Sequence, residues 1–146
     1  MKKSVIFLIG IIYLVSIVIV TFFGMQIAID QFKIYMTEIE ITNQECRMID
    51  GEKYIIVEFD SVQGYTSIFI DYETAPDNAS NPEKISFRIS GNEFVDGEGN
   101  VSIYATVTDN GEVTFTRPGQ VVVTVSTEDG SRLSDTVNIL CKKPRQ

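Results

Sequence analysis

An uncharged stretch near the N-terminus constrains this chain more than any other feature of its sequence. Residues 4–29 contain no Lys, Arg, Asp or Glu. As an α-helix the stretch would be about 39 Å long, at about 1.5 Å per residue, whereas the hydrocarbon core of a bilayer is about 30 Å thick. A helix also satisfies its own backbone hydrogen bonds in lipid. The sequence therefore predicts a single transmembrane helix within an anchor formed by residues 1–30.

The charged residues on either side of the stretch predict its orientation. Lys2 and Lys3 precede it, and Asp30 follows it. Because basic residues are retained on the cytoplasmic side of a membrane, we expect the N-terminus in the cytoplasm. The chain would then cross the cell membrane once, and its C-terminal domain would be extracytoplasmic.

Three alternatives compete with an uncleaved signal-anchor. A cleaved signal peptide has an apolar core of about 7–15 residues that ends in an A-x-A-like pattern of small residues. The stretch is longer, and Gly24 and Ala28 have Phe22 and Gln26 two positions before them. Pilin-like subunits resemble one another in a Glu five residues into the mature helix, whereas the first acid here is Asp30. A buried helix of a soluble protein does not need so long an uncharged run.

Outside the anchor the chain is acidic. Lys2 and Lys3 are two of the 12 Lys and Arg residues, so 10 remain against 20 Asp and Glu, a net charge of about −10. Such a domain repels nucleic acid, which basic patches usually bind, and we expect no nucleic-acid partner. The chain contains no His, which removes Ser-His and Cys-His catalytic pairs and imidazole metal ligands. Paired carboxylates could still hydrolyse sugars, but they would need a cleft, which a small two-layer sandwich rarely provides. We therefore expect no enzyme activity and no cofactor.

The pattern of apolar residues changes after a short stem at residues 31–36. Residues 37–42 alternate between apolar and polar, with the period of two that half-buried strands show. Residues 53–59 and 120–127 are rich in β-branched side chains, which favour strands. Asn110-Gly111 predicts a tight turn, because this pair tolerates positive φ.

The remaining segments continue this all-β pattern. Residues 91–100 read as a polar, glycine-rich loop that contains one apolar pair, and residues 101–108 read as one strand. About eight short strands separated by turns, without a helical period, are typical of a β-sandwich. The sequence therefore predicts an all-β sandwich domain at residues 37–146.

Two blocks of sequence resemble the bacterial immunoglobulin-like domain of group 2. The blocks cover roughly half of the chain, and they are residues 72–81 followed by 84–87, and residues 105–114 followed by Pro118-Gly119, 121–127 and 129–131. Three features depart from the family pattern. Phe87 stands where the family commonly has Trp, residues 90–104 are longer than the family norm, and residues 37–64 hold one strand more than the family requires.

The resemblance implies an immunoglobulin-like β-sandwich that acts as an extracellular structural or adhesive module on the cell surface. It brings no catalytic residues with it. The ligand would be a protein or a cell-surface polymer. The alternative is a subunit of a larger membrane or envelope assembly, pilin-like or scaffolding, in which the apolar helix packs against partner helices.

The sequence offers two site candidates. Asp96, Glu98 and Asn100 place oxygen ligands at alternate positions, as calcium loops do, although an EF-hand would need a Gly and an acid where Val101 and Val107 stand. The plain alternative is a solvated loop.

Cys46 and Cys141 are the second candidate. They lie in the first and last parts of the predicted domain, and strands from these parts are often neighbours in immunoglobulin-like sandwiches. The oxidising outer face of a membrane would permit a disulfide between them. The alternative is two buried free thiols.

Overall fold

The apolar stretch forms one helix, α1 (Lys3–Gln31), in a computed structural model that describes residues 3–144, with residues 26–31 described by their backbone alone. The side chains between Lys3 and Met25 are exposed in the described part of the chain. Ser16 and Thr21 donate their hydroxyls to the carbonyls of Ile12 and Ile17, four residues back. These hydroxyls therefore need no water, as a helix in lipid requires.

The chain divides into two compact units, of which the first ends at Ile34 and the second begins at Tyr35. The second unit already includes Met36, which is 2% exposed. Its backbone N–H donates to Oδ2 of Asp129 at 2.7 Å, and the next N–H, of Thr37, donates to the carbonyl of Ala75. Of residues 31–36, which the sequence assigns to a stem, Gln31 is the last residue of α1, and Tyr35 and Met36 belong to the second unit.

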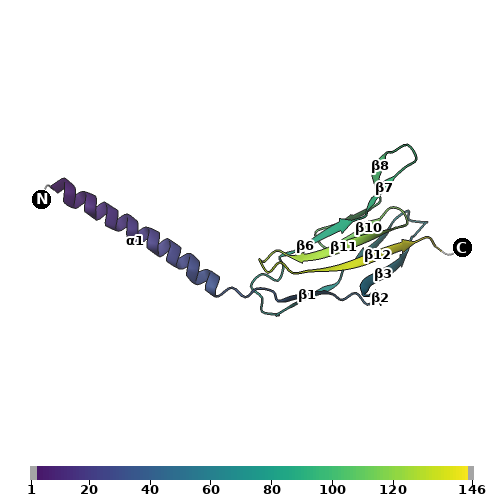
Figure 1. The fold of residues 1–146 in the computed structure, drawn as a ribbon, viewed down its shortest axis with the longest axis horizontal. Helices are drawn as coiled ribbons and strands as arrows, with labels where there is room; N and C mark the ends of the chain where they lie inside the picture. Colours follow the sequence, from purple (N-terminus) through teal and green to yellow (C-terminus); the bar gives the residue numbers. More distant parts are fainter. Residues whose placement is uncertain (1–2, 145–146) are drawn as a thin grey trace. The chain divides into compact units, whose positions relative to one another are not determined.

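The described part of the second unit contains twelve strands (Figure 1). Their bounds are β1 (Glu38–Ile41), β2 (Arg47–Ile49), β3 (Glu52–Glu58), β4 (Thr66–Phe69), β5 (Tyr72–Ala75), β6 (Ile85–Ser90), β7 (Glu93–Val95), β8 (Val101–Ile103), β9 (Ala105–Val107), β10 (Glu112–Phe115), β11 (Gly119–Thr127) and β12 (Ser134–Lys142).

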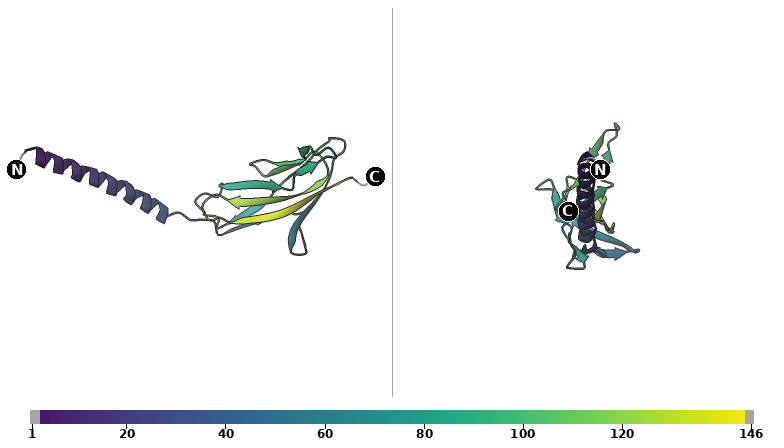
Figure 2. Two further views of the ribbon diagram at one scale, coloured as in Figure 1. Left: turned by 45° about the horizontal axis from the view of Figure 1, so that its top comes forward. Right: turned by 90° about the vertical axis from the view of Figure 1, so that its left-hand side faces the viewer.

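Two layers of strands build the sandwich, which Figure 2 shows from two further directions. One layer is a five-stranded sheet in the order β2-β3-β12-β11-β6. The other layer consists of β1 paired with β5 and of β4-β10-β9. Because β4 and β5 follow each other directly in the chain, and Ile70 and Asp71 between them bond to Gly111 and Thr42, this layer reads β1–β4/β5–β10–β9.

This topology is that of an immunoglobulin-like sandwich. In such folds the strands called A, B, E and D form one sheet, and G, F and C form the other. The layer β1–β4/β5–β10–β9 has the first order, and β12-β11-β6 has the second. β3 extends the second sheet by pairing parallel to β12, with Ile55 opposite Ile139. The all-β sandwich and the single apolar helix predicted from the sequence are confirmed.

The core lies between the layers and follows the alternation of the strands. β11 buries every second residue, and its fully buried members are Val121, Val123 and Val125. Phe115 from β10 and Ile55 from β3 meet them from the two layers. The predicted turn at Asn110-Gly111 is confirmed, since Gly111 has φ +78° and a Cβ there would lie 2.8 Å from the ring of Phe87.

One segment differs from the sequence-based expectation. Residues 91–100, read as a loop, and residues 101–108, read as one strand, instead contain the hairpin β7–β8 and the separate strand β9. β8 pairs with β7, whereas β9 pairs with β10. The prediction was wrong because alternation within a stretch says nothing about a change of partner at Tyr104.

Candidate functional site

The hairpin β7–β8 projects from the sandwich, and we call residues 93–103 the arm (Figures 1 and 2). β7 and β8 pair only with each other, in the register Glu93 opposite Ile103 and Val95 opposite Val101. Since side chains alternate between the faces of a strand, these four residues share one face of the arm. Phe94 and Ser102, which lies opposite it, point to the other face.

The shared face is apolar and open to solvent. Val95, Val101 and Ile103 are 58%, 60% and 62% exposed. On the opposite face the guanidinium of Arg117 lies over the ring of Phe94, with 3.7 Å from Cζ to the ring centroid. One face of the arm is therefore covered from within the domain, and the other is left bare.

Tyr104 fixes the base of the arm. Its ring is buried, and its hydroxyl lies 2.6 Å from the carbonyl oxygen of Gly91 and 2.7 Å from that of Gln120, so one proton is shared between two acceptors. Its backbone N–H donates to Asn92, and the Asn92 amide donates to the carbonyl of Ala105 at 2.9 Å. Both strands of the arm are thus held where they leave the sandwich.

Asp96 organises the tip of the arm. Oδ1 of Asp96 accepts the backbone N–H groups of Glu98 and Asn100 at 2.9 and 2.8 Å, and Oδ2 accepts the Asn100 side-chain amide at 3.0 Å. These bonds, the Asn100 side chain first, hold the pKa of Asp96 below its usual value. Oxygens engaged in this way close the hairpin loop.

Calcium binding by Asp96, Glu98 and Asn100 stays an untested prediction. Among residues 3–144, no group of three or more Cys, Asp or Glu side chains is gathered closely enough to hold a metal ion. Asn100 also turns its amide nitrogen, rather than its oxygen, toward Asp96. A calcium ion at this loop would have to displace the bonds that form the turn.

Both cysteines are free thiols in the structure. Cys141 is buried on β12, where burial raises the pKa of its thiol, and half-buried Cys46 immediately precedes β2. β3 lies between β2 and β12, so the β2 and β12 backbones are about 9–10 Å apart. The Cα atoms of two cysteines joined by a disulfide are usually only about 4.4–6.8 Å apart. The predicted disulfide remains to be tested by intact mass after alkylation, with and without reductant.

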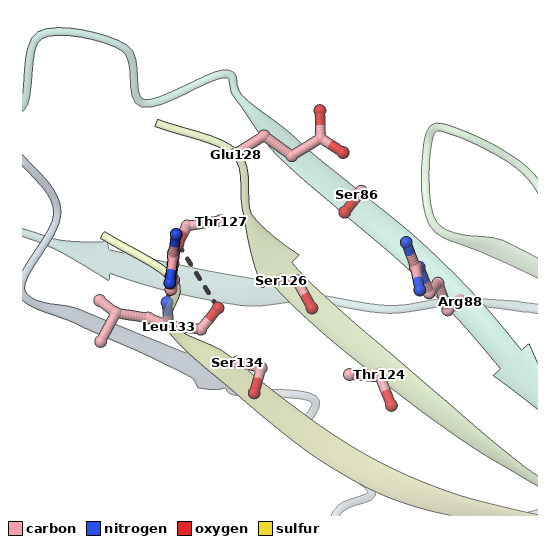
Figure 3. A pocket seen from close by; sticks show the side chains of 9 residues that line it. Ser86, Arg88, Thr124, Ser126, Thr127, Glu128, Leu133 and Ser134 are labelled. Atoms are coloured by element: carbon pink, nitrogen blue, oxygen red, sulfur yellow. Dashed lines mark hydrogen bonds between the residues drawn. The ribbon is translucent and has the colours of Figure 1, made fainter. Parts of the chain in front are cut away.

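A shallow depression lies on the outer face of the five-stranded sheet and encloses about 550 Å³ (Figure 3). Ser86, Ser126 and Ser134 face each other across three strands, in the register of β6, β11 and β12. Arg88 and Glu128 bring charges of both signs to the rim. An open hollow lined mainly by hydroxyls is typical of a solvated sheet face, and it lacks the enclosed apolar volume of small-molecule sites.

Comparisons with known proteins leave the family open. No protein-family model matches the chain. No curated protein matches it. Among solved structures the chain is similar to the crystal structure of an EHEC O157:H7 intimin mutant, with 16% identity over 73% of this chain and a TM-score of 0.42. The match spans 48% of that structure's chain.

The arm is the candidate functional site because its apolar face is exposed, and the sequence analysis did not predict this site. Its signal was present, because apolar residues on either side of the turn-forming run Asp96-Gly97-Glu98-Gly99-Asn100 are typical of a hairpin. No pattern in the sequence predicts that the side chains of Val95, Val101 and Ile103 are exposed. Which side of a strand is bare depends on what the fold places beside it.

Proposed function

We propose that this chain is a membrane-anchored, extracytoplasmic module that acts through binding or structural contact and has no catalytic role. One observation supports the proposal above the others. Residues 3–25 form a helix that is long and apolar enough to cross a membrane, and none of its side chains is buried within the described part of the chain. Exposing that much apolar surface to water is costly, and lipid removes the cost.

A signal sequence near the N-terminus would pass the same test of length and composition. The uncleaved anchor is therefore part of the proposal, with Lys2 and Lys3 keeping the N-terminus in the cytoplasm. The folded domain would then stand outside, where its acidic surface keeps it soluble.

We also propose that the domain is of the bacterial group 2 type. The resembling blocks correspond to elements that lie at turns and pairings of the sandwich. Residues 105–114 cover β9, the turn at Gly111 and most of β10, and residues 72–81 cover β5 and the chain that follows it. These are segments that define an immunoglobulin-like fold, so they support a structural or adhesive role rather than chemistry.

The test is the fate of the anchor in cells that produce the full chain. We expect the chain in the membrane fraction, with an intact mass that retains residues 1–30 and with the domain accessible to protease added from outside. A variant that carries Ile12→Arg and Val15→Arg is the control, because each Arg at a helix centre costs about 2.5–3.5 kcal/mol of insertion. A soluble chain, or one that has lost its first 25–30 residues, would refute the anchor.

The assembly-subunit alternative predicts a different result in the same preparation. In mild detergent a free module remains monomeric, whereas a subunit purifies with partners in fixed proportion. Native mass spectrometry of the detergent-solubilised chain separates these cases.

A further inference from the structure

We propose that the apolar face of the arm, formed by Val95, Val101 and Ile103, is a docking surface for a protein whose contact site is an apolar groove edged by Lys and Arg. The inference deepens the proposed function, since it names the surface through which the module binds. It does not depend on how the chain is held at the membrane.

The first step is the cost of leaving this face bare. Each of its three apolar side chains is more than half exposed, although the domain has a closed core that buries comparable residues completely. The cross-strand pair Val95 and Val101 contributes only weakly to the stability of the hairpin, and the arm is also held at its base by Tyr104 and at its tip by Asp96. Contiguous exposed apolar side chains of this kind mark interaction sites in soluble domains.

The second step is preorganisation. Tyr104 and Asn92 fasten both strands of the arm to the sandwich, and Asp96 closes its tip. Because these contacts already order the arm, a partner would not have to supply the conformational entropy of ordering it. A surface that is rigid and apolar before binding is suited to a groove of matching shape.

The third step is charge, which selects the partner. Glu93 lies on the apolar face, across from Ile103, and Asp96 and Glu98 lie at the tip. The nearby cation, Arg117, is stacked on Phe94 at the opposite face. With the chain outside the anchor at about −10, a second copy, an anionic lipid or a nucleic acid would bring like charge against like, whereas Lys and Arg at the rim would complement it.

The fourth step is accessibility. The base of the arm touches the start of β11 at Gln120, whereas Met36, where the chain enters the domain, is held by Asp129 just beyond the end of β11. A strand of this length spans about 30 Å at about 3.3 Å per residue. The arm is therefore at the end of the domain that is remote from the chain entry, so the entering chain does not cover its apolar face.

The experiment is site-specific photocrosslinking of the full chain in the cells that naturally produce it. The photoreactive probe benzoyl-phenylalanine replaces Val101 in one version and Val62 in another. Val62 is the matched control because it is 97% exposed, lies in the turn between β3 and β4, and belongs to neither strand of the arm. Each version is also made with Glu93→Lys and Glu98→Lys. Unchanged thermal unfolding of the purified variants shows that the domain still folds.

We expect one protein adduct at Val101 and none at Val62. Mass spectrometry of the adduct should map it to an apolar peptide of the partner flanked by Lys or Arg, and the charge reversals should lower its yield about tenfold. The inference is overturned by an adduct with a second copy, lipid or polymer, by equal adducts at both positions, by insensitivity to the charge reversals, or by no adduct. A chain that stays in the membrane without an adduct refutes this inference and leaves the proposed function intact.

Discussion

At the scale of single residues, Asp135 links the two layers. Its Oδ2 accepts Nζ of Lys53 at 2.6 Å and the backbone N–H of Ile41 at 2.8 Å, and Ile41 belongs to the opposite layer. Burial raises the pKa of Asp135, but the bonds from Lys53, Ile41 and Thr136 outweigh it and hold this pKa below 3.8. Burial lowers the pKa of Lys53, and its bonds and attraction to Asp135 and Glu40 outweigh that effect, so this pKa is above 10.5.

These shifts give the pair a defined pH window. A lowered Asp pKa stabilises the fold above the unfolded value, and this stabilisation disappears as pH falls through the folded pKa. A raised Lys pKa stabilises below its unfolded value, and this part disappears as pH rises through the folded pKa. We predict that Asp135→Asn costs about 1–3 kcal/mol at neutral pH and flattens the acid limb. Thermal unfolding in detergent from pH 3 to pH 11 measures the cost at neutral pH and the loss of stability in acid. A variant that loses stability in acid as the native chain does would contradict the role given to Asp135.

Gly119 is a second residue of interest, because the packing around it leaves no room for a side chain. A Cβ at this position would lie 2.8 Å from Cζ and 3.1 Å from Cδ2 of the Tyr104 ring. We predict that Gly119→Ala destabilises the domain by about 1–3 kcal/mol, because the buried ring cannot move without breaking its hydrogen bonds. Gly97→Ala is the matched control, since nothing lies within 4 Å of a Cβ there. Equal unfolding midpoints for the two variants would show that the ring adapts freely.

At the scale of elements, the arm is a two-stranded sheet that joins neither layer of the sandwich among the described residues. Its strands bond only to each other, and its fixation comes from its base and its tip. Local opening should therefore be easier here than in β11 and β12, which have neighbours on both sides.

We predict that Asp96→Ala accelerates hydrogen exchange at the amides of Glu98 and Asn100 and leaves the unfolding midpoint of the domain unchanged. The alanine cannot accept the N–H bonds that close the tip. Because the pKa of Asp96 is lowered, the protection in the native chain should persist at a pH at which an ordinary Asp is already protonated, and it should fade only as pH falls through this lowered pKa. Added Ca²⁺ should not slow exchange further, and a calcium-dependent increase in protection would revive the calcium alternative.

At the scale of the whole molecule, the chain divides between Ile34 and Tyr35 into an apolar unit and a β-rich unit that has its own core. Asp129 holds the chain where it enters the second unit, because its buried carboxylate accepts the Met36 N–H at 2.7 Å. The same carboxylate accepts both the N–H and the hydroxyl of Ser131.

We predict that Asp129→Ala destabilises the domain by about 1–3 kcal/mol, since it leaves a buried N–H at Met36 without its acceptor. The same change should speed proteolysis at residues 35–37 in the full detergent-solubilised chain. Asp109→Ala, in the exposed turn before Gly111, is the control and should change neither rate nor midpoint. Equal cleavage rates for both variants would mean that Asp129 does not hold the entry strand.

Local patterns in the sequence determined much of this molecule. The uncharged run of residues 4–29 dictates a helix by its composition alone. Period-two alternation dictates the strands of the core, as β1, β3 and β11 show, and the Asn110-Gly111 pair dictates its turn. Each of these features depends on neighbours within a few residues, so the sequence carries it directly.

Only the tertiary structure decided the rest, because it depends on pairings between distant residues. The parallel pairing of β3 with β12, the change of partner at Tyr104 and the link from Asp135 to Ile41 join residues that are up to 94 positions apart. The sequence contains Val95, Val101 and Ile103 as ordinary strand residues. They become an exposed apolar face because the fold directs β7 and β8 away from both sheets, which leaves these side chains without a covering layer.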